Sequence, residues 1–276
     1  MEKPEQIARA KSFGDLHHAE RILVMANPWD VVSARLFYKA GFPALATTSG
    51  GVAFAQGYPD GEKISREEMA AAVKRIADAI PIPLSADMEG GYGPAPEDVA
   101  ETVRQAIAAG AVGVNIEDST KEGPNPLFDP SLAVERIRAA VEAGESAGVP
   151  IVVNARTDGF RQGDDSEVFD DTVRRANAYR AAGAACLFVP WVRDADRIGE
   201  LVRQIEGPVN VLAAASSPPV AALEALGVAR VTVGASLSRA CLTTARAAAA
   251  EMLGPGTFEF GRDVMTQAQV HDLIKD

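Results

Sequence analysis

Short apolar runs alternate with longer amphipathic stretches along the whole chain of 276 residues. Each run is rich in aliphatic residues, and a polar loop follows it, as is typical of a buried parallel strand. The predicted strands are Ile22–Ala26, Ala44–Thr48, Pro83–Asp87, Val112–Glu117, Ile151–Ala155, Cys186–Pro190, Val209–Ala213 and Arg230–Gly234. Eight strands separated by helices predict a single-domain α/β fold, a (β/α)8 barrel of the TIM type.

The stretches between the strands are rich in alanine and have apolar residues at helical spacing. The predicted helices are Val32–Ala40, Ser65–Ala79, Pro96–Ala109, Ser131–Ala147, Asp170–Ala182, Asp194–Ile205 and Pro218–Leu226. A glycine just before the next strand is expected to end several of them in the left-handed conformation, namely Gly41, Gly110, Gly148, Gly183 and Gly227. A doubly wound sheet is the alternative, but it would place a glycine-rich phosphate loop after the first strand, where this chain has NPWD.

The chain continues beyond the eighth predicted strand with more helix than one barrel element needs. Helical patterns cover Ala235–Leu253 and Asp263–Lys275. We expect these C-terminal helices, within residues 235–276, to lie in an interface with a neighbouring subunit.

Composition and charge narrow the function. The net charge of −11 disfavours nucleic acid and anionic membranes as partners, because no basic stripe is visible that would neutralise phosphates. A small anionic substrate is favoured instead, and a local cation or arginine has to attract it. The two cysteines suggest neither a metal knuckle nor a disulfide framework, and no leader or membrane segment is apparent, so we expect a cytoplasmic protein.

Acidic residues follow the third and fourth predicted strands, where barrel enzymes place their catalytic groups. Asp87 and Glu89 occupy alternate positions of an extended segment, and Glu117 ends the neighbouring strand. Carboxylate oxygens suit Mg²⁺ or Mn²⁺, so the three residues are predicted to hold a divalent cation. The alternative is that they are helix caps or solvated loop charges.

Two further features are predicted to bind an anionic substrate. Arg156 follows an apolar run and is interpreted as a clamp for a carboxylate or phosphoryl group, although an ion pair with Asp158 or Glu117 is also possible. Ser49-Gly50-Gly51 follows the second strand and offers backbone N–H groups and a hydroxyl, and Thr47 joins it as a substrate-binding candidate. A simple turn is the alternative for the glycine pair.

Four motifs in order along nearly the whole chain resemble the isocitrate lyase/phosphoenolpyruvate mutase superfamily: NPWDVVSARLFYKAGFPALATTSGGVA, SADMEGGYG, VNIEDS and VNARTDGF. The resemblance implies a barrel, usually a homotetramer with a helix swapped between subunits, that binds Mg²⁺ and a small 2-oxo acid or enolpyruvate compound. It makes Asp87 the inner metal ligand and Glu89 a replacement for the usual second aspartate. It also implies that Glu117 holds water around the metal, that Arg156 and Ser49-Gly50-Gly51 bind substrate, and that Asp60 belongs to the active site.

The loop after the fourth strand departs from the carbon–carbon lyases of this superfamily. Those members carry a KKCGH-type motif whose cysteine is the acid/base, whereas this loop reads DSTKEGPNPLFD, and Asn125 stands where the cysteine would fall. Asparagine at that point resembles the mutase and phosphonopyruvate hydrolase branches, and a cysteine-free oxaloacetate decarboxylase is a further possibility.

The resulting hypothesis is a Mg²⁺-dependent lyase or mutase. It would make or break the C–C or C–P bond next to a pyruvate enolate in phosphoenolpyruvate, phosphonopyruvate or an oxaloacetate-like substrate. A class II pyruvate aldolase on the same kind of barrel and a non-catalytic barrel that binds an oxo acid are the alternatives.

Overall fold

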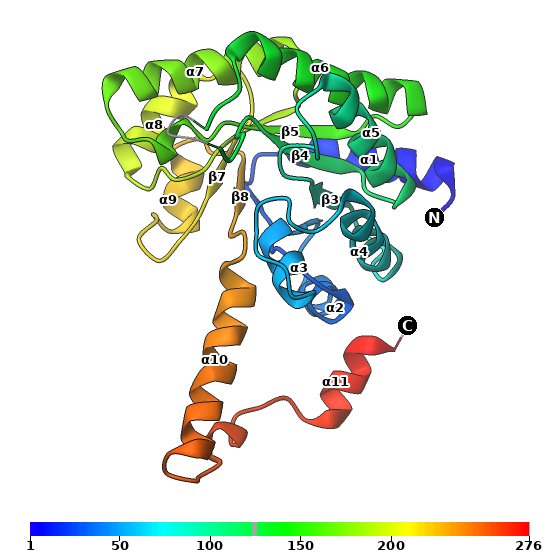
Figure 1. Ribbon diagram of the computed structural model, residues 1–276, viewed down its shortest axis with the longest axis vertical. Helices are drawn as coiled ribbons and strands as arrows, with labels where there is room; N and C mark the ends of the chain where they lie inside the picture. The colour runs from blue at the N-terminus through cyan, green and yellow to red at the C-terminus, as the bar shows by residue number, and fades with distance from the viewer. Residues whose placement is uncertain (123–125, 276) are drawn as a thin grey trace.

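Eight parallel strands form one sheet in the computed structural model, which describes residues 1–122 and 126–275 (Figure 1). The order along the sheet is β1-β8-β7-β6-β5-β4-β3-β2. The edges meet, because the backbone N–H of Ala46 donates to Ala26 O (3.2 Å) and that of Thr48 donates to Pro28 O (3.3 Å). The predicted (β/α)8 barrel is thus confirmed. Its strands are β1 (Leu23–Val24), β2 (Leu45–Ala46), β3 (Leu84–Asp87), β4 (Gly113–Glu117), β5 (Val152–Arg156), β6 (Cys186–Val189), β7 (Val209–Leu212) and β8 (Arg230–Thr232).

The helices surround the sheet and extend beyond it. They are α1 (Lys3–Leu16), α2 (Val31–Lys39), α3 (Ser49–Ala55), α4 (Arg66–Asp78), α5 (Pro96–Ala108), α6 (Pro130–Ala147), α7 (Ser166–Ala181), α8 (Ala195–Gln204), α9 (Val220–Ala225), α10 (Ser236–Leu253) and α11 (Gln267–Ile274), with short 3₁₀ turns at Gly159–Arg161 and Glu259–Gly261. The five glycines expected after helices all have positive φ angles, and Gly148 (φ 66°) is the C-cap of α6. These glycines allow each helix to stop and the chain to turn into the next strand.

Helix α1 was not predicted, and it closes the amino-terminal end of the barrel. Its buried residues are Gln6, Ala10 and Phe13, so one polar residue interrupts the apolar stripe that would have indicated a helix. The ring of Phe13 fills the space beside Gly113, where an added Cβ would lie 2.6 Å from Phe13 Cε1. Gln6 Nε2 donates to the carbonyls of Ile107 (2.8 Å) and Ala111 (3.0 Å), which ties α1 to the end of α5.

The strand register brings the polar strand ends together. Asp87 at the end of β3 pairs with Asn115 of β4, and Glu117 at the end of β4 pairs with Arg156 at the end of β5. Paired residues on neighbouring strands point to the same side of the sheet. The side chains that carry the candidate chemistry are therefore neighbours at the carboxyl end of the barrel.

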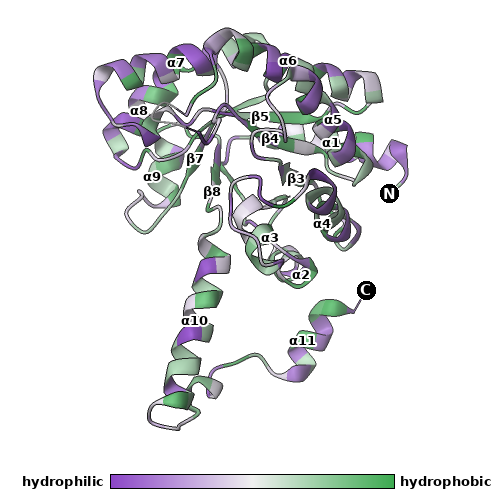
Figure 2. Ribbon diagram, viewed as in Figure 1, coloured by the Kyte–Doolittle hydropathy of each residue, from purple (hydrophilic) through white to green (hydrophobic). Residues whose placement is uncertain are grey.

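Helix α10 leaves the barrel after β8 and projects away from it, and α11 returns towards α2 (Figures 1 and 2). Of the α10 residues only Ser238 is buried. Helix α11 contacts α2, where Lys39 donates from Nζ to the carbonyl of Asp272. No helix in the described ranges is long and apolar enough to cross a membrane.

One buried histidine makes the stability of the fold depend on pH. His17, at the end of α1, donates from Nδ1 to Phe13 O (2.8 Å), and burial together with the charge of Arg230 lowers its pKa from 6.5 to about 3. The unfolded chain therefore binds a proton at His17 more readily than the folded protein does. The fold keeps its full stability above pH 6.5 and loses stability as the pH falls below that value.

We expect the wild-type free energy of unfolding to lose about 1.4 kcal/mol through His17 between pH 7.5 and 5.5. The His17→Asn variant, which keeps a donor but does not titrate, should lose correspondingly less over that interval. Urea denaturation at both pH values measures the difference. The neighbouring exposed His18→Asn variant is the control and should follow the wild type. Equal pH dependence of the wild type and His17→Asn would contradict a buried neutral imidazole.

Candidate active site

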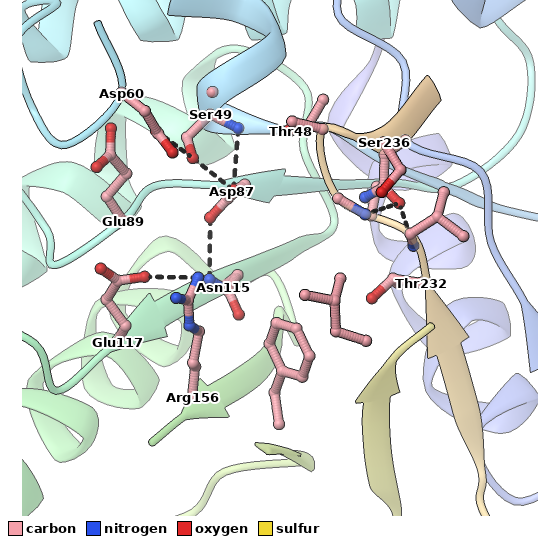
Figure 3. A pocket seen from close by; sticks show the side chains of 18 of the residues that line it. Thr48, Ser49, Asp60, Asp87, Glu89, Asn115, Glu117, Arg156, Thr232 and Ser236 are labelled. Atoms are coloured by element: carbon pink, nitrogen blue, oxygen red, sulfur yellow. Dashed lines mark hydrogen bonds and ion pairs between the residues drawn. The ribbon is translucent and has the colours of Figure 1, made fainter. Parts of the chain in front are cut away.

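A cavity of about 1140 Å³ opens at the carboxyl end of the barrel and extends down between the strands (Figure 3). Its wall includes every described residue of the predicted site except Gly51, namely Thr47, Ser49, Gly50, Asp60, Asp87, Glu89, Glu117 and Arg156. The side chains thus lie around one space, as expected for the active site of a barrel.

Asp87 is fixed in the middle of this group by three hydrogen bonds. Its Oδ2 accepts from the backbone N–H of Ser49 (2.9 Å) and from Ser49 Oγ (2.7 Å), and its Oδ1 accepts from Asn115 Nδ2 (2.9 Å) (Figure 3). The N–H of Asp87 itself donates to Thr47 Oγ1 (2.8 Å). Thr47 therefore positions the backbone of Asp87 while also lining the cavity.

Ser49-Gly50-Gly51 is the first turn of α3, a helix that the sequence analysis did not predict. Thr48 is the N-cap, and its side chain accepts from the N–H of Gly51 (3.3 Å). A Cβ at Gly51 would lie 2.6 Å from Thr48 Cγ2, and one at Gly50 would lie 3.0 Å from Asp60 Oδ2. Close packing therefore explains both glycines. The segment is thus helical, and its role in substrate binding stays a prediction.

Glu89 lies almost entirely out of solvent in a left-handed backbone conformation. Its side chain is 3% exposed and its φ angle is 52°. Oε2 accepts from the N–H of Glu62 (2.9 Å), whereas Oε1 has no hydrogen-bond partner in the described part of the chain. Burial raises the pKa of Glu89, and the nearby ammonium of Lys121 partly opposes this shift. An uncompensated buried carboxylate oxygen is the kind of group that a cation or its water would satisfy.

Glu117 and Arg156 form a buried ion pair that Asp158 extends. Arg156 Nη1 lies 2.8 Å from Glu117 Oε2, and its Nε and Nη2 donate to Asp158 Oδ1 (2.6 Å) and Oδ2 (2.8 Å). Burial raises the pKa of Glu117 above its usual range, and the positive charge of Arg156 opposes that shift. Both ion pairs that were considered as alternatives to a substrate clamp are thus present. A guanidinium has N–H groups on both Nη atoms beyond those engaged here, so a clamp remains compatible with them.

Asp158 is held in turn by residues to which the sequence analysis gave no role. Its N–H donates to Asp118 Oδ1 (3.0 Å), and Asp118 Oδ2 accepts from the hydroxyl of Tyr179 (2.7 Å) and lies 3.5 Å from Arg175 Nη1. Tyr179 and Arg175 both lie in α7. In the sequence they were part of an ordinary amphipathic pattern, and only their contacts with Asp118 distinguish them.

Lys121 is the second group that sequence reasoning missed. Its ammonium makes ion pairs with Glu89 and with Glu117, whose Oε1 lies 3.4 Å from Nζ. The side chain is 22% exposed and starts from a residue with a φ angle of 60°. The signal in the sequence was a lysine four residues after Glu117, in the loop that departs from the family motif.

The described residues contain no group of three or more His, Cys, Asp or Glu side chains arranged to hold a metal ion. Asp87, Glu89 and Glu117 therefore do not form one direct ligand shell. Their oxygen chemistry still fits Mg²⁺, which binds through one or two carboxylates and keeps several waters, and Glu89 Oε1 is unsatisfied. The assignment of these residues to a cation stays a prediction, with Asp87 as the direct ligand and the two glutamates around it.

Asp60 and Asn125 are the two remaining predicted residues. Asp60 lies in the turn after α3, where its Oδ1 accepts from the N–H of Gly61 (3.1 Å) and lies 3.5 Å from Ser49 Oγ. It therefore joins the group around Asp87 (Figure 3). Asn125 lies outside the described residues. Trp191 also lines the cavity and donates from Nε1 to Asp158 Oδ1 (3.3 Å).

A polar cavity rimmed by carboxylates at the carboxyl end of a (β/α)8 barrel is the arrangement of a barrel enzyme. The model of the phosphoenolpyruvate phosphomutase family matches residues 13–253, and the chain belongs to this family, within the isocitrate lyase/phosphoenolpyruvate mutase superfamily.

Three relatives illustrate the range of the family. An uncharacterized Mycobacterium tuberculosis protein is 40% identical over 225 residues, which cover 81% of each chain. The 2-methylisocitrate lyase of Escherichia coli is 32% identical over 200 residues, which cover 68% of this chain and 66% of the lyase. A solved structure from Burkholderia cenocepacia J2315, described only provisionally as a lyase/mutase, is 41% identical with a TM-score of 0.92, covering 98% of this chain and 96% of the other.

The position of Lys121 leads to a test of the cation prediction. Replacing it with methionine leaves Glu89 and Glu117 with one positive partner fewer, so the free energy of unfolding without divalent cations should fall by about 2 kcal/mol. Because the competing ammonium is gone, Mg²⁺ or Mn²⁺ should then raise the Tm of Lys121→Met more than that of the wild type.

Differential scanning calorimetry with and without each cation measures both effects. Lys63→Met is the matched control, since Lys63 is an exposed lysine that lines the same cavity, and it should behave like the wild type. An identical cation response in the wild type and Lys121→Met would show that the ammonium and the cation do not share these carboxylates.

Proposed function

We propose that this protein is a Mg²⁺- or Mn²⁺-dependent lyase that breaks the bond next to a pyruvate enolate in a small anionic oxo acid. The observation that carries the proposal is the charge of the cavity. Seven lysines and arginines but only four aspartates and glutamates line it, although the chain as a whole has a net charge of −11. A local excess of positive charge concentrates small anions that the rest of the surface repels.

The side chains that would bind the cation and those that would bind the substrate carboxylate lie on two sides of the cavity. On one side, Ser49 and Asn115 hold the carboxylate of Asp87 in place by hydrogen bonds. On the other, Asp158 and Glu117 fix the plane of the Arg156 guanidinium, whose remaining N–H groups would bind a carboxylate of the substrate. A divalent cation held by Asp87, with Glu89 and Glu117 around it, would supply electrostatic stabilisation of the developing enolate.

Cleavage of a C–C bond is favoured over transfer of a phosphoryl group. Loss of a carboxylate or of a carbonyl fragment from an oxo acid needs no covalent nucleophile, whereas a mutase has to hold or accept the phosphoryl group. An oxaloacetate-like acid is therefore the first substrate to test. Phosphonopyruvate and phosphoenolpyruvate follow as the C–P alternative that the family model supports.

The two other hypotheses have less support. A class II pyruvate aldolase needs a general base, and His17, His18 and His271 all lie away from the cavity. A barrel that only binds an oxo acid would not need to bury Glu89 and Glu117, whose charged forms are costly out of water.

The first experiment follows release of pyruvate and phosphate by NMR from a panel of oxo acids with the purified protein and Mg²⁺. We expect Mg²⁺-dependent turnover of at least one C–C substrate, and we expect Asp87→Ala to lower its rate by at least about 10²-fold because the fixed carboxylate is lost. Asp78→Ala, which removes an exposed aspartate on α4, is the control. Failure of every candidate to react would count against a lyase, and a normal rate in Asp87→Ala would count against the cation role of Asp87.

We also propose that α10 and the segment after it bind another copy of the chain, in a homotetramer built as a dimer of dimers. Large apolar side chains stand exposed along this arm, including Leu242 (57%), Leu253 (89%), Phe258 (69%) and Val264 (61%). Apolar groups in such a row favour a protein interface over solvent. Figure 2 shows hydrophobic residues recurring along α10 and α11.

Light scattering coupled to size-exclusion chromatography tests the assembly. The wild type should elute with the mass of a tetramer, and the double variant Leu253→Asp/Phe258→Asp should dissociate to smaller species because two charges would enter the interface. Val220→Asp, which alters an exposed valine on α9, should leave the mass unchanged. A monomeric wild type would refute the proposed homotetramer.

A further inference from the structure

Deep in the cavity, a second arginine has no counter-ion in the described part of the chain. Arg230 is the first residue of β8, is 2% exposed and lines the cavity from within the barrel. Its Nε and Nη1 meet no hydrogen-bond partner among the described residues. Arg156, by contrast, is bound by Asp158 and Glu117. A buried guanidinium without a counter-charge is costly, so something outside the described chain has to stabilise it.

The groups around Arg230 do not provide that charge. The ring of Phe13, whose centroid lies 5.8 Å from Arg230 Cζ, carries no charge. Burial raises the pKa of the Cys186 thiol to about 11, so that it remains neutral at neutral pH. His17 is also neutral there because burial lowers its pKa to about 3. Asp87 attracts Arg230 from a distance, but its oxygens are already bound by Ser49 and Asn115.

The unsatisfied polar atoms nearby are mostly donors. Asn210 of β7 stands directly opposite Arg230 in the strand register, and its Nδ2 has no partner in the described ranges. Its Oδ1 accepts from the hydroxyl of Thr232 (3.5 Å), so the amide N–H groups are the part of the side chain that is free to donate to a ligand. Ser85 Oγ is unsatisfied on the wall of the same cavity. Asn154 Oδ1 is an acceptor on the same wall, and His17 Nε2 is another unsatisfied acceptor, because the ring donates from Nδ1 to Phe13 O.

We propose that Arg230 and Asn210 bind a small anion at the floor of the cavity, below the group around Asp87. Guanidinium and amide N–H groups that face each other across adjacent strands suit a single negative charge, either a halide ion or one carboxylate group. A water molecule would satisfy hydrogen bonds but would leave the charge of Arg230 uncompensated. This inference depends on neither the cation nor the reaction proposed above.

Bromide is the probe, because it replaces chloride and is visible by anomalous scattering. The protein is purified in chloride-free gluconate buffer, and its Tm is then measured in increasing sodium bromide against sodium gluconate at equal ionic strength. Binding to the folded state alone should raise the wild-type Tm by about 2 to 4 °C at saturating bromide. Crystals soaked in bromide should show an anomalous peak within hydrogen-bonding distance of Arg230 Nε or Nη1 and of Asn210 Nδ2.

Two variants separate a specific site from general salt effects. Arg230→Met removes the charge and should abolish the bromide-dependent rise in Tm. Asn210→Asp places a carboxylate opposite Arg230, so it should raise the Tm in gluconate and also remove the response to bromide, because the counter-ion is now built in. Both changes lower the net charge of the site by one unit, but only Arg230→Met removes the guanidinium, so Asn210→Asp keeps the test decisive if Arg230→Met does not fold.

Small carboxylates distinguish the two sources of the anion. If pyruvate or oxalate raises the Tm and bromide competes with it, the site takes a carboxylate group of the small-acid ligand. If bromide and the acids stabilise the protein additively, the site holds a free halide. Surface bromide peaks without one at Arg230, or the same bromide response in the wild type, Arg230→Met and Asn210→Asp, would overturn the proposal.

Discussion

The burial of Asp158 is the constraint on which this end of the barrel depends. A carboxylate that is 0% exposed is tolerated only if charged and hydrogen-bonding partners surround it. Arg156 supplies two donors, and the N–H of Asp158 is itself anchored on Asp118. Removing Arg156 would leave Asp158 with Arg161, whose Nη1 lies 3.6 Å from Asp158 Oδ2, as its charged partner in the described part of the chain. The ends of β4 and β5 and the inner face of α7 are thus coupled through one chain of charges.

That chain of charges continues to the other side of the cavity. Arg156 binds Glu117, Glu117 shares Lys121 with Glu89, and Glu89 accepts from the N–H of Glu62. Positive and negative charges alternate, so each buried group lowers the free-energy cost of burying the charge next to it. A divalent cation entering this series has to displace or supplement Lys121. Lys121 lies in the loop that departs from the family motif, yet its ammonium contacts two carboxylates that the family resemblance singles out.

The periodicity of the sequence was sufficient for the barrel but not for the supports of its site. Eight apolar runs and the glycines between them predicted every strand, because strands of a buried parallel sheet are rich in aliphatic residues. Helix α1 was missed because Gln6 interrupts its apolar stripe, and α3 because glycines at 50 and 51 oppose helix formation.

In the candidate site, residues that stand out in their local sequence could be predicted, and residues that depend on contacts with distant parts of the chain could not. Asp87, Glu89, Glu117 and Arg156 were identifiable because each polar residue ends or follows an apolar strand. Tyr179 could not be identified as a support, since its contact with Asp118 joins residues 61 positions apart. Lys121 was equally hidden, because a lysine in a polar loop has no unusual neighbour in the sequence. Only the fold brings it to two buried carboxylates.

Arg156 and Arg230 show how one cavity can treat two buried guanidinium groups differently. Arg156 is neutralised by two carboxylates, so an anion that it binds adds a negative charge to a region already balanced. Such an anion has to be held by directional hydrogen bonds or by an added cation. Arg230 has no such pairing in the described chain, so an anion there removes a charge imbalance. The mouth of the cavity thus suits an anion that has to be oriented, and its floor suits an anion that supplies a counter-charge.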